Sequence, residues 1–155
     1  RRVRRPAAPT SATMTDPAPR PIEFPDELPA IRRVMTPQDT NAMGTVFGGA
    51  ILSDIDLAAA IAAHRHHCGN VVTVAMDKIE FLHPVFVGDV LTIFARALKI
   101  GRSSITIKTD VFAERRLTNG EVIKVTEAQV TMVAVDEDLR PIAVQERCAD
   151  EDSTP

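Results

Sequence analysis

The chain has 155 residues, of which 45% are hydrophobic, so it is long enough for one domain with a packed core. Its net charge of −3 and its lack of Trp and Tyr argue against nucleic acid as a partner, because phosphate binding needs a basic face and base stacking needs aromatic rings. No apolar run approaches the roughly 20 residues that cross a bilayer, so we expect no membrane partner.

Both ends of the chain have the composition of tails. Residues 1–27 are rich in Arg, Pro, Ala and Thr, so we expect a disordered tail with the natural start near Met14. Residues 145–155 are polar and acidic and are expected to fray, which leaves a folded domain at 28–144. The two cysteines, Cys68 and Cys148, lie far apart, which predicts no disulfide scaffold and a reducing, cytoplasmic location.

The first predicted elements are a short strand at residues 30–35 and a loop at 36–49 that contains several glycines. An apolar run from near Gly48 to near His67 then predicts a helix of about 17 to 20 residues. Gly69 follows this run and is suited to a helix C-cap.

After the helix the hydrophobic period changes to that of strands. Four segments are predicted to be strands, at residues 70–85, 88–101, 102–114 and 121–138. Asn119-Gly120, between the last two, favours a tight turn. Along the last segment Lys124 and Ala128 fall on one face, and Val125 and Glu127 fall on the other. The turns between the strands are short, which indicates antiparallel pairing.

The helix is apolar on most of its sides and must therefore be enclosed. The predicted fold class is α+β, with a curved antiparallel sheet wrapped around one long central helix. One helix leaves much of such a sheet uncovered, so we expect the chain to form a dimer by extending the sheet.

Two carboxylates, Asp54 and Asp56, interrupt the apolar helix. At about 100° per residue, six residues form one core stripe: Ile51, Leu52, Ile55, Ala58, Ala59 and Ala62. The two acids flank this stripe on opposite sides at similar angles, so periodicity does not choose between them. The helix dipole stabilises acids in the first turn, but Asp56 lies more than two turns in and has no basic residue one turn away. An unpaired carboxylate beside small apolar residues is a candidate general base.

Other constellations that carry chemistry are weaker. The segment "HRHHC", residues 64–68, resembles a metal-binding cluster, but its side chains scatter around a helix end and only His64 and Cys68 share a face. We therefore expect no metal site and no required cofactor. Neither cysteine lies at a helix start beside a base, so a cysteine nucleophile has no support.

Four stretches, in chain order, resemble the acyl-CoA thioesterases of the hotdog fold, in the branch that includes the bacterial YciA-type enzymes and the cytosolic brain acyl-CoA hydrolase. They are "PQDTNAMGTVFGGAILSDID", "VVTVAMDKIEFLHPVFVGDVL", "KIGRSSITIKTDVF" and "VTEAQVTMVAVDEDLRPIAV". The resemblance covers roughly residues 30–144. It implies a hotdog fold and the hydrolysis of acyl-CoA to a free carboxylic acid and CoA.

The resemblance also implies catalytic residues. The family's catalytic Asp lies seven residues after the second glycine of a Gly-Gly pair, which is Asp56 here, acting as general base on water or as nucleophile. Asp54 has no such role, so Asp54→Asn is expected to be a mild control. Backbone N–H groups of Gly48 and Gly49 would polarise the thioester carbonyl.

The loop at residues 41–49 of one subunit would face Asp56 of the other. Thr45 stands where several family members carry Asn or Asp, which puts a two-acid mechanism in doubt and leaves more of the work to Asp56, the glycine amides and Asn41.

For the coenzyme, the resemblance implies contacts from the turn formed by Gly101, Arg102, Ser103 and Ser104, and from the strand backbone at Val72, Thr73 and Val74. Arg102 is equally well explained as an ordinary solvated hairpin residue. Weaker phosphate-binding candidates are Lys99, Arg115, Arg116 and Lys124. The family's assembly is a dimer, often a trimer of dimers.

Two other functions stay open on this fold. One is a protein that binds acyl-CoA without catalysis, which the departure at Thr45 favours. The other is a dehydratase or hydratase of enoyl thioesters, for which His83 in "FLHP" is only a faint match. The sequence also leaves open whether the thioester is carried by CoA or by a protein-bound pantetheine.

Overall fold

The computed structural model describes residues 27–118 and 120–145, so the predicted tails lie outside the described residues except at Glu27 and Gln145. The elements in chain order are β1 (Ile31–Val34), the 3-10 helix η1 (Pro37–Asp39), α1 (Gly48–Ala63), β2 (Asn70–Asp77), β3 (Val90–Ile100), β4 (Ser104–Glu114) and β5 (Val122–Val135). The long helix and the strands after it are the elements that the sequence predicts.

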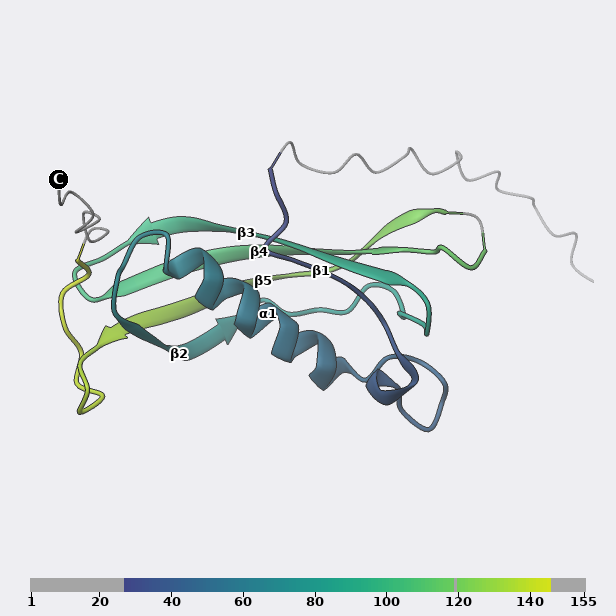
Figure 1. Ribbon diagram of the computed structural model, residues 1–155, viewed down its shortest axis with the longest axis horizontal. Helices are drawn as coiled ribbons and strands as arrows, with labels where there is room; N and C mark the ends of the chain where they lie inside the picture. The colour runs from purple at the N-terminus through teal and green to yellow at the C-terminus, as the bar shows by residue number, and fades with distance from the viewer. Residues whose placement is uncertain (1–26, 119, 146–155) are drawn as a thin grey trace, which may run out of the picture.

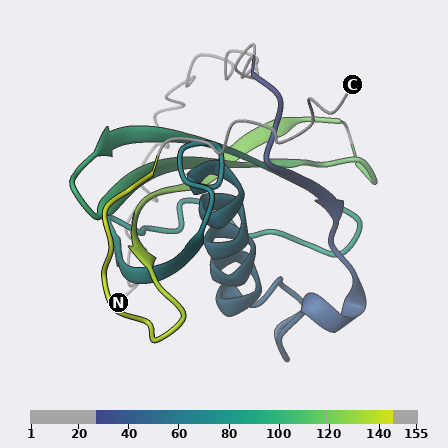
Figure 2. The same ribbon diagram turned by 60° about the vertical axis from the view of Figure 1, so that its left-hand side comes forward.

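The five strands form one sheet in the order β1-β3-β4-β5-β2, and every neighbouring pair is antiparallel. Figure 1 and Figure 2 show this sheet curling around α1, which lies along its concave face. The predicted α+β class and the curved sheet around one central helix are confirmed. The edges of the sheet are β1 and β2.

The core lies between α1 and the concave face of the sheet. Five residues of the predicted helix stripe are buried, and Leu52 is partly buried. Burial alternates along the first half of β4, where Ile105 and Ile107 are fully buried, because successive side chains of a strand point to opposite faces. In β3 the first six residues, including Ile93, are all buried.

One flank of α1 is left uncovered by the sheet. Leu57 is 57% exposed and Ile61 is 39% exposed. The predicted enclosure of the helix is therefore complete only on the side that faces the sheet. Large apolar side chains that gather on one exposed flank mark a surface for a partner.

Two element boundaries differ from the prediction. α1 ends at Ala63 instead of near His67, because the Arg65 N–H donates to the Ala62 carbonyl (3.2 Å) in a tight turn that does not continue the helix. β2 ends at Asp77, because Lys78 has a φ of 60° and turns the chain away from β5. Residues 79–85 therefore form a loop and not the second half of a strand.

The alternation predicted for β5 breaks at a bulge opposite β4. Thr126 pairs with Val111 while Lys124 pairs with Phe112, so the strand holds one extra residue between these pairs. As a result Val125 and Ala128 are both buried in the core. The predicted division of faces is wrong here, because a bulge reverses which face each residue occupies.

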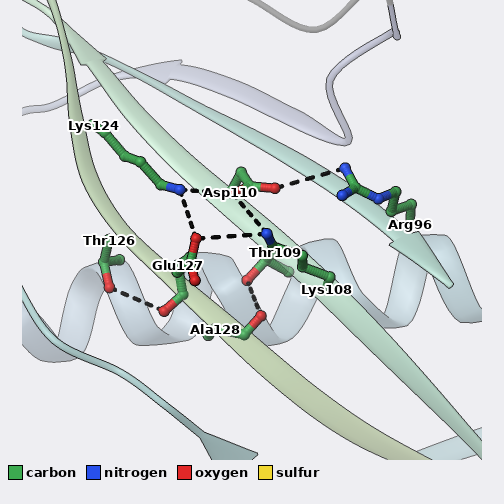
Figure 3. Close-up of polar contacts among 8 residues, drawn as sticks. All are labelled: Arg96, Lys108, Thr109, Asp110, Lys124, Thr126, Glu127 and Ala128. Carbon is green, nitrogen blue, oxygen red and sulfur yellow. Dashed lines mark hydrogen bonds and ion pairs between the residues drawn. The ribbon is translucent and has the colours of Figure 1, made fainter. Parts of the chain in front are cut away.

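The outer face of the sheet carries charged side chains, and Figure 3 shows them with α1 behind the strands. Lys124 donates to Asp110 at 3.0 Å and to Glu127 at 2.6 Å. Lys108 lies 3.6 Å from Asp110, and Arg96 lies 3.7 Å from it. Three cations therefore surround two carboxylates on the face opposite the helix.

The prediction of no disulfide is wrong at Cys68, which is disulfide-bonded, while Cys148 lies outside the described residues. A long separation in sequence does not prevent a disulfide, because only the spatial distance between the two Cα atoms limits it. Within residues 27–118 and 120–145, no helix is long and apolar enough to cross a membrane.

Candidate functional site

Asp56 lies in the middle of α1 and faces the edge strand β2. The Thr73 hydroxyl donates a hydrogen bond to Asp56 Oδ1 at 2.5 Å and lies 3.1 Å from the Met132 sulfur. Among the described residues, no donor reaches the other carboxylate oxygen, Oδ2. The helix and the strand thus hold one oxygen of a half-buried carboxylate and leave the second oxygen available.

Asp54 has a different environment, although the helical angle makes it equivalent to Asp56. Asp54 is 9% exposed, and its Oδ2 accepts a hydrogen bond from Arg33 Nε at 2.9 Å. A buried carboxylate with a guanidinium partner is a structural ion pair. Sequence patterns do not indicate this pair, because Arg33 lies in β1, 21 residues before Asp54 in the chain. We therefore predict that Asp54→Asn disturbs this ion pair, and we choose another position as the control for Asp56.

Asn41 and Thr45 lie together in the loop that precedes α1. The Asn41 side-chain amide donates to Thr45 Oγ1 at 2.9 Å, and the Asn41 N–H donates to the Thr45 carbonyl at 2.8 Å. Asn41 Oδ1 also accepts from the Met43 N–H. The two predicted polar residues of the loop are thus brought together and fix each other's orientation.

Gly48 and Gly49 form the first turn of α1, as predicted. Phe47 is the N-cap residue, and it offers no side-chain hydrogen bond. Within the described parts of the chain, the N–H groups of the two glycines find no backbone acceptor, as is usual for the first turn of a helix. A Cβ on Gly49 would lie 2.3 Å from the Phe47 ring, so a side chain at this position would displace that ring.

A pocket of about 240 Å³ opens beside Thr45 and Gly48. Apolar side chains make up most of its remaining wall: Val46, Ile51, Phe81, Leu82, Pro84 and Val85. A Cβ on Gly48 would lie 3.4 Å from the Phe81 ring, so Phe81 packs directly over the start of the helix. Sequence reasoning placed Phe81 in a strand and missed its position against the glycine pair.

Asp56 does not reach this pocket in the same chain. It lies eight residues after Gly48 on α1, which corresponds to about 12 Å along the helix axis. The structure therefore separates the predicted carboxylate from the predicted carbonyl-binding amides, as the resemblance implies for a site built from two subunits.

The turn between β3 and β4 lies at the other end of the sheet from the glycine pair (Figure 1). The Gly101 N–H donates to the Ser104 carbonyl at 2.7 Å and closes the turn. The C-terminal segment crosses it, since the Val144 N–H donates to the Arg102 carbonyl at 2.8 Å. The Arg102 side chain is exposed.

Three of the four weaker phosphate candidates already have acidic partners. Arg115 pairs with Asp89 and lies over the Phe86 ring, and Arg116 pairs with Glu114. Lys124 belongs to the charged group on the outer face shown in Figure 3, where Asp110 and Glu127 raise its pKa against the opposing effect of burial. Lys99, near the β3–β4 turn, is exposed.

The histidines at the end of α1 have separate environments. His64 is exposed, whereas His67 is 1% exposed and its Nδ1 accepts from the Gln145 N–H at 3.0 Å. In the part of the chain that the structure describes, no three His, Cys, Asp or Glu side chains gather as metal ligands do. His83, the dehydratase candidate, bonds through Nδ1 to the Lys124 carbonyl at 3.0 Å.

Comparison with known proteins adds to this geometry. The family model of the thioesterase superfamily matches residues 43–119. The uncharacterized acyl-CoA thioester hydrolase ZMO0511 of Zymomonas mobilis is 46% identical over 117 residues, which cover 75% of this chain and 77% of that protein. The acyl-CoA thioester hydrolase YciA of Salmonella typhimurium is 42% identical over 119 residues, covering 74% and 90%.

Among solved structures, the hexameric thioesterase y2039 from Yersinia pestis superposes with a TM-score of 0.74 at 40% identity, covering 80% of this chain and all of that one. The chain belongs to the thioesterase superfamily. Within it, the chain is a member of the YciA-type group of acyl-CoA thioester hydrolases, and its sheet curled around α1 is the hotdog fold.

Proposed function

We propose that the protein hydrolyses the thioester bond of acyl-CoA, releasing a free carboxylic acid and CoA. The observation that carries the proposal is the state of Asp56 on α1, a half-buried carboxylate with Oδ1 held by Thr73 and Oδ2 without a donor among the described residues. The activity named for the relatives, acyl-CoA thioester hydrolysis, supports the same reaction.

Asp56 Oδ2 has two possible roles in this reaction. As a general base it takes a proton from water, and the resulting hydroxide attacks the thioester carbon. As a nucleophile it attacks that carbon itself, and the C–S bond breaks as the CoA thiolate leaves, which gives a mixed anhydride. Water then hydrolyses this anhydride to the free carboxylic acid and restores the Asp56 carboxylate. In both cases the negative charge develops on the carbonyl oxygen, and the unpaired amides of Gly48 and Gly49 are suited to stabilise it.

We propose that these amides come from a second copy of the chain, because about 12 Å of helix separates Gly48 from Asp56 within one chain. The edge strand β2 and the uncovered flank of α1 supply the surface for this second copy, with Leu57, Ile61 and Val74 all substantially exposed. The hexamer named for the Yersinia pestis relative supports a trimer of such dimers.

The apolar pocket beside Thr45 and Gly48 suits the acyl chain, because Gly48 lines this pocket and a carbonyl held by its amide would bring the acyl chain next to the apolar wall. The β3–β4 turn with Arg102, together with the backbone of β2 around Thr73, remains our proposal for the CoA moiety. The proposed catalytic domain covers residues 28–144, and the proposed location is the cytoplasm, which cell fractionation would test.

The test is a thiol-release assay with a panel of acyl-CoAs on wild type and Asp56→Asn. We expect Asp56→Asn to lose at least about a hundredfold in kcat, the usual contribution of a general base, while it still binds CoA. Ser53→Ala, on an exposed position of the same helix, is the matched control and should keep wild-type turnover. Normal turnover by Asp56→Asn would show that the assignment is wrong.

The same samples separate the alternative functions. A protein that binds acyl-CoA without catalysis would release no thiol, and an enoyl hydratase would change the absorbance of an enoyl-CoA. Competition by free CoA distinguishes a CoA substrate from a protein-bound pantetheine.

A further inference from the structure

Arg33 of β1 joins two acidic residues from two other elements. Its Nε donates to Asp54 Oδ2 of α1 at 2.9 Å. Its terminal nitrogens donate to the two carboxylate oxygens of Asp39, in η1, at 3.0 and 3.1 Å. One guanidinium group therefore connects the edge strand β1, the middle of α1 and the short helix that precedes it.

The chemistry of this group requires an arginine. Asp54 is 9% exposed, and a carboxylate at that depth needs a charged partner. The two-point contact with Asp39 uses the planar fork of a guanidinium, which the single ammonium of lysine does not reproduce. Arg33 and Thr36 together lower the pKa of Asp39 to about 2, so the carboxylate stays ionised at neutral pH.

Asp39 also connects the Arg33 side chain to the start of α1. Its carboxylate accepts from the Thr36 N–H and hydroxyl, both at 2.8 Å, which folds residues 36–39 into a compact turn. Its backbone carbonyl accepts from the Phe47 N–H at 2.7 Å. Phe47 is the N-cap of α1 and directly precedes Gly48. Only two hydrogen-bonded steps thus separate the Arg33 guanidinium from the glycine pair.

We propose that Arg33 is a positioning residue, which holds the loop at residues 36–47 against α1 and so fixes the direction of the Gly48 and Gly49 amides. The inference rests on the proposed function, in which these amides stabilise the negative oxygen. Amides aimed in advance cost no reorganisation during the reaction, and a small misplacement of them is costly.

The test compares Arg33→Lys with wild type in the intact oligomer. Lysine keeps the charge near Asp54 but loses the fork to Asp39. We expect kcat to fall about tenfold or more and KM to change less than about threefold, because the misplaced amides act mainly in the transition state. Arg32→Lys is the matched control on the adjacent position of β1, where the arginine pairs with Glu114, and its kcat should stay at the wild-type value.

A second measurement separates positioning from simple stability. Amide hydrogen exchange should become faster in residues 36–49 of Arg33→Lys, while the strands β3 and β4 keep wild-type protection. Asp54→Asn removes the charged partner of Arg33 on α1 but leaves Asp39 in place. It should also make hydrogen exchange in residues 36–49 faster, but by less than Arg33→Lys does. The double variant Arg33→Lys/Asp54→Asn should lose less catalytic free energy, calculated from kcat, than the sum of the losses in the two single variants, because both residues act through one network.

Three results would overturn the proposal, and the first two are unchanged exchange in residues 36–49 and a wild-type kcat despite faster exchange. A uniform rise of exchange over the whole sheet would also overturn it, since Arg33 would then act on global stability. If the wild-type protein releases no thiol from any acyl-CoA, the proposed function fails. The exchange comparison still decides whether Arg33 holds the loop.

Discussion

At the scale of single residues, Asp39 makes the folding stability depend on pH in the acid range. Its carboxylate receives hydrogen bonds from Arg33 and Thr36, and these lower its pKa from 3.8 to about 2. A carboxyl group whose pKa is lower in the folded state than in the unfolded state binds protons more weakly when folded. It therefore adds stability above pH 4, and this contribution is lost as the pH falls from about 4 towards 2.

We predict that Asp39→Asn removes this part of the acid dependence. Urea denaturation of wild type and variant at a series of pH values should show their midpoints furthest apart at neutral pH and converging towards pH 2. Asp138→Asn, at a largely exposed carboxylate, is the control and should follow wild type throughout. A constant difference between Asp39→Asn and wild type at every pH would contradict the prediction.

The two aspartates of α1 show what a sequence conveys about single residues. Their chemical difference is long-range: Asp54 meets Arg33 from β1, and Asp56 meets Thr73 from β2. Helical periodicity describes one element and has no information on which side chain a neighbouring element presents. The seven-residue spacing from the glycine pair, known from the family resemblance, was the signal that pointed to Asp56. For Asp39, the capping-box spacing from Thr36 was a usable signal that we did not apply.

At the scale of elements, the loop after β2 shapes the apolar pocket. Lys78 turns the chain out of the sheet and brings Phe81 over Gly48, where the ring forms part of the pocket wall. The pocket has a volume of about 240 Å³, and the Phe81 ring in its wall is 43% exposed.

We predict that Phe81→Ala shifts the preference towards longer acyl chains. Removing the ring enlarges the pocket, so kcat/KM for lauroyl-CoA should rise relative to butyryl-CoA by about three- to tenfold, the effect of burying one or two more methylene groups. Val87→Ala, at an exposed residue of the same loop region that does not line the pocket, should keep the wild-type ratio. An unchanged ratio of kcat/KM values in Phe81→Ala would show that the acyl chain does not bind in this pocket.

The elements themselves were largely predictable, and their irregular points were not. Hydrophobic period identified α1 and the strands, because one face of each element packs in a common core. The early end of α1 at Ala63, the end of β2 at Asp77 and the extra residue in β5 all depend on a single backbone turn or bulge. Such local turns and bulges change the spacing of hydrophobic residues along the chain very little, so hydrophobic periodicity alone does not detect them.

At the scale of the whole molecule, the uncovered flank of α1 and the edge strand β2 form the main surface on which apolar side chains and strand backbone are left without a partner in the described residues. Leu57 is 57% exposed and Val74 is 59% exposed, and the edge of β2 away from β5 has no neighbour in the described sheet. In the dimer that we propose, the second copy covers both features and brings its glycine pair towards Asp56.

We predict that Leu57→Glu reduces the assembly and the activity together. A charge on this flank opposes burial against a partner, so light scattering should show a smaller species, and thiol release should fall in proportion to the lost interface. Leu139→Glu, at an exposed residue in the turn after β5, should leave both unchanged. A Leu57→Glu protein that is smaller yet fully active would show that one chain suffices for catalysis.

The separation of Gly48 from Asp56 along α1 has a genetic consequence. If each site takes its acid from one chain and its amides from another, a substitution at Asp56 and a substitution at the glycine pair of the same chain damage two different sites. Two inactive variants, one damaged at Asp56 and one at the glycine pair, would then restore one complete site when they assemble together. A chain that carries both defects would restore none and would disable both sites that it shares with an intact partner.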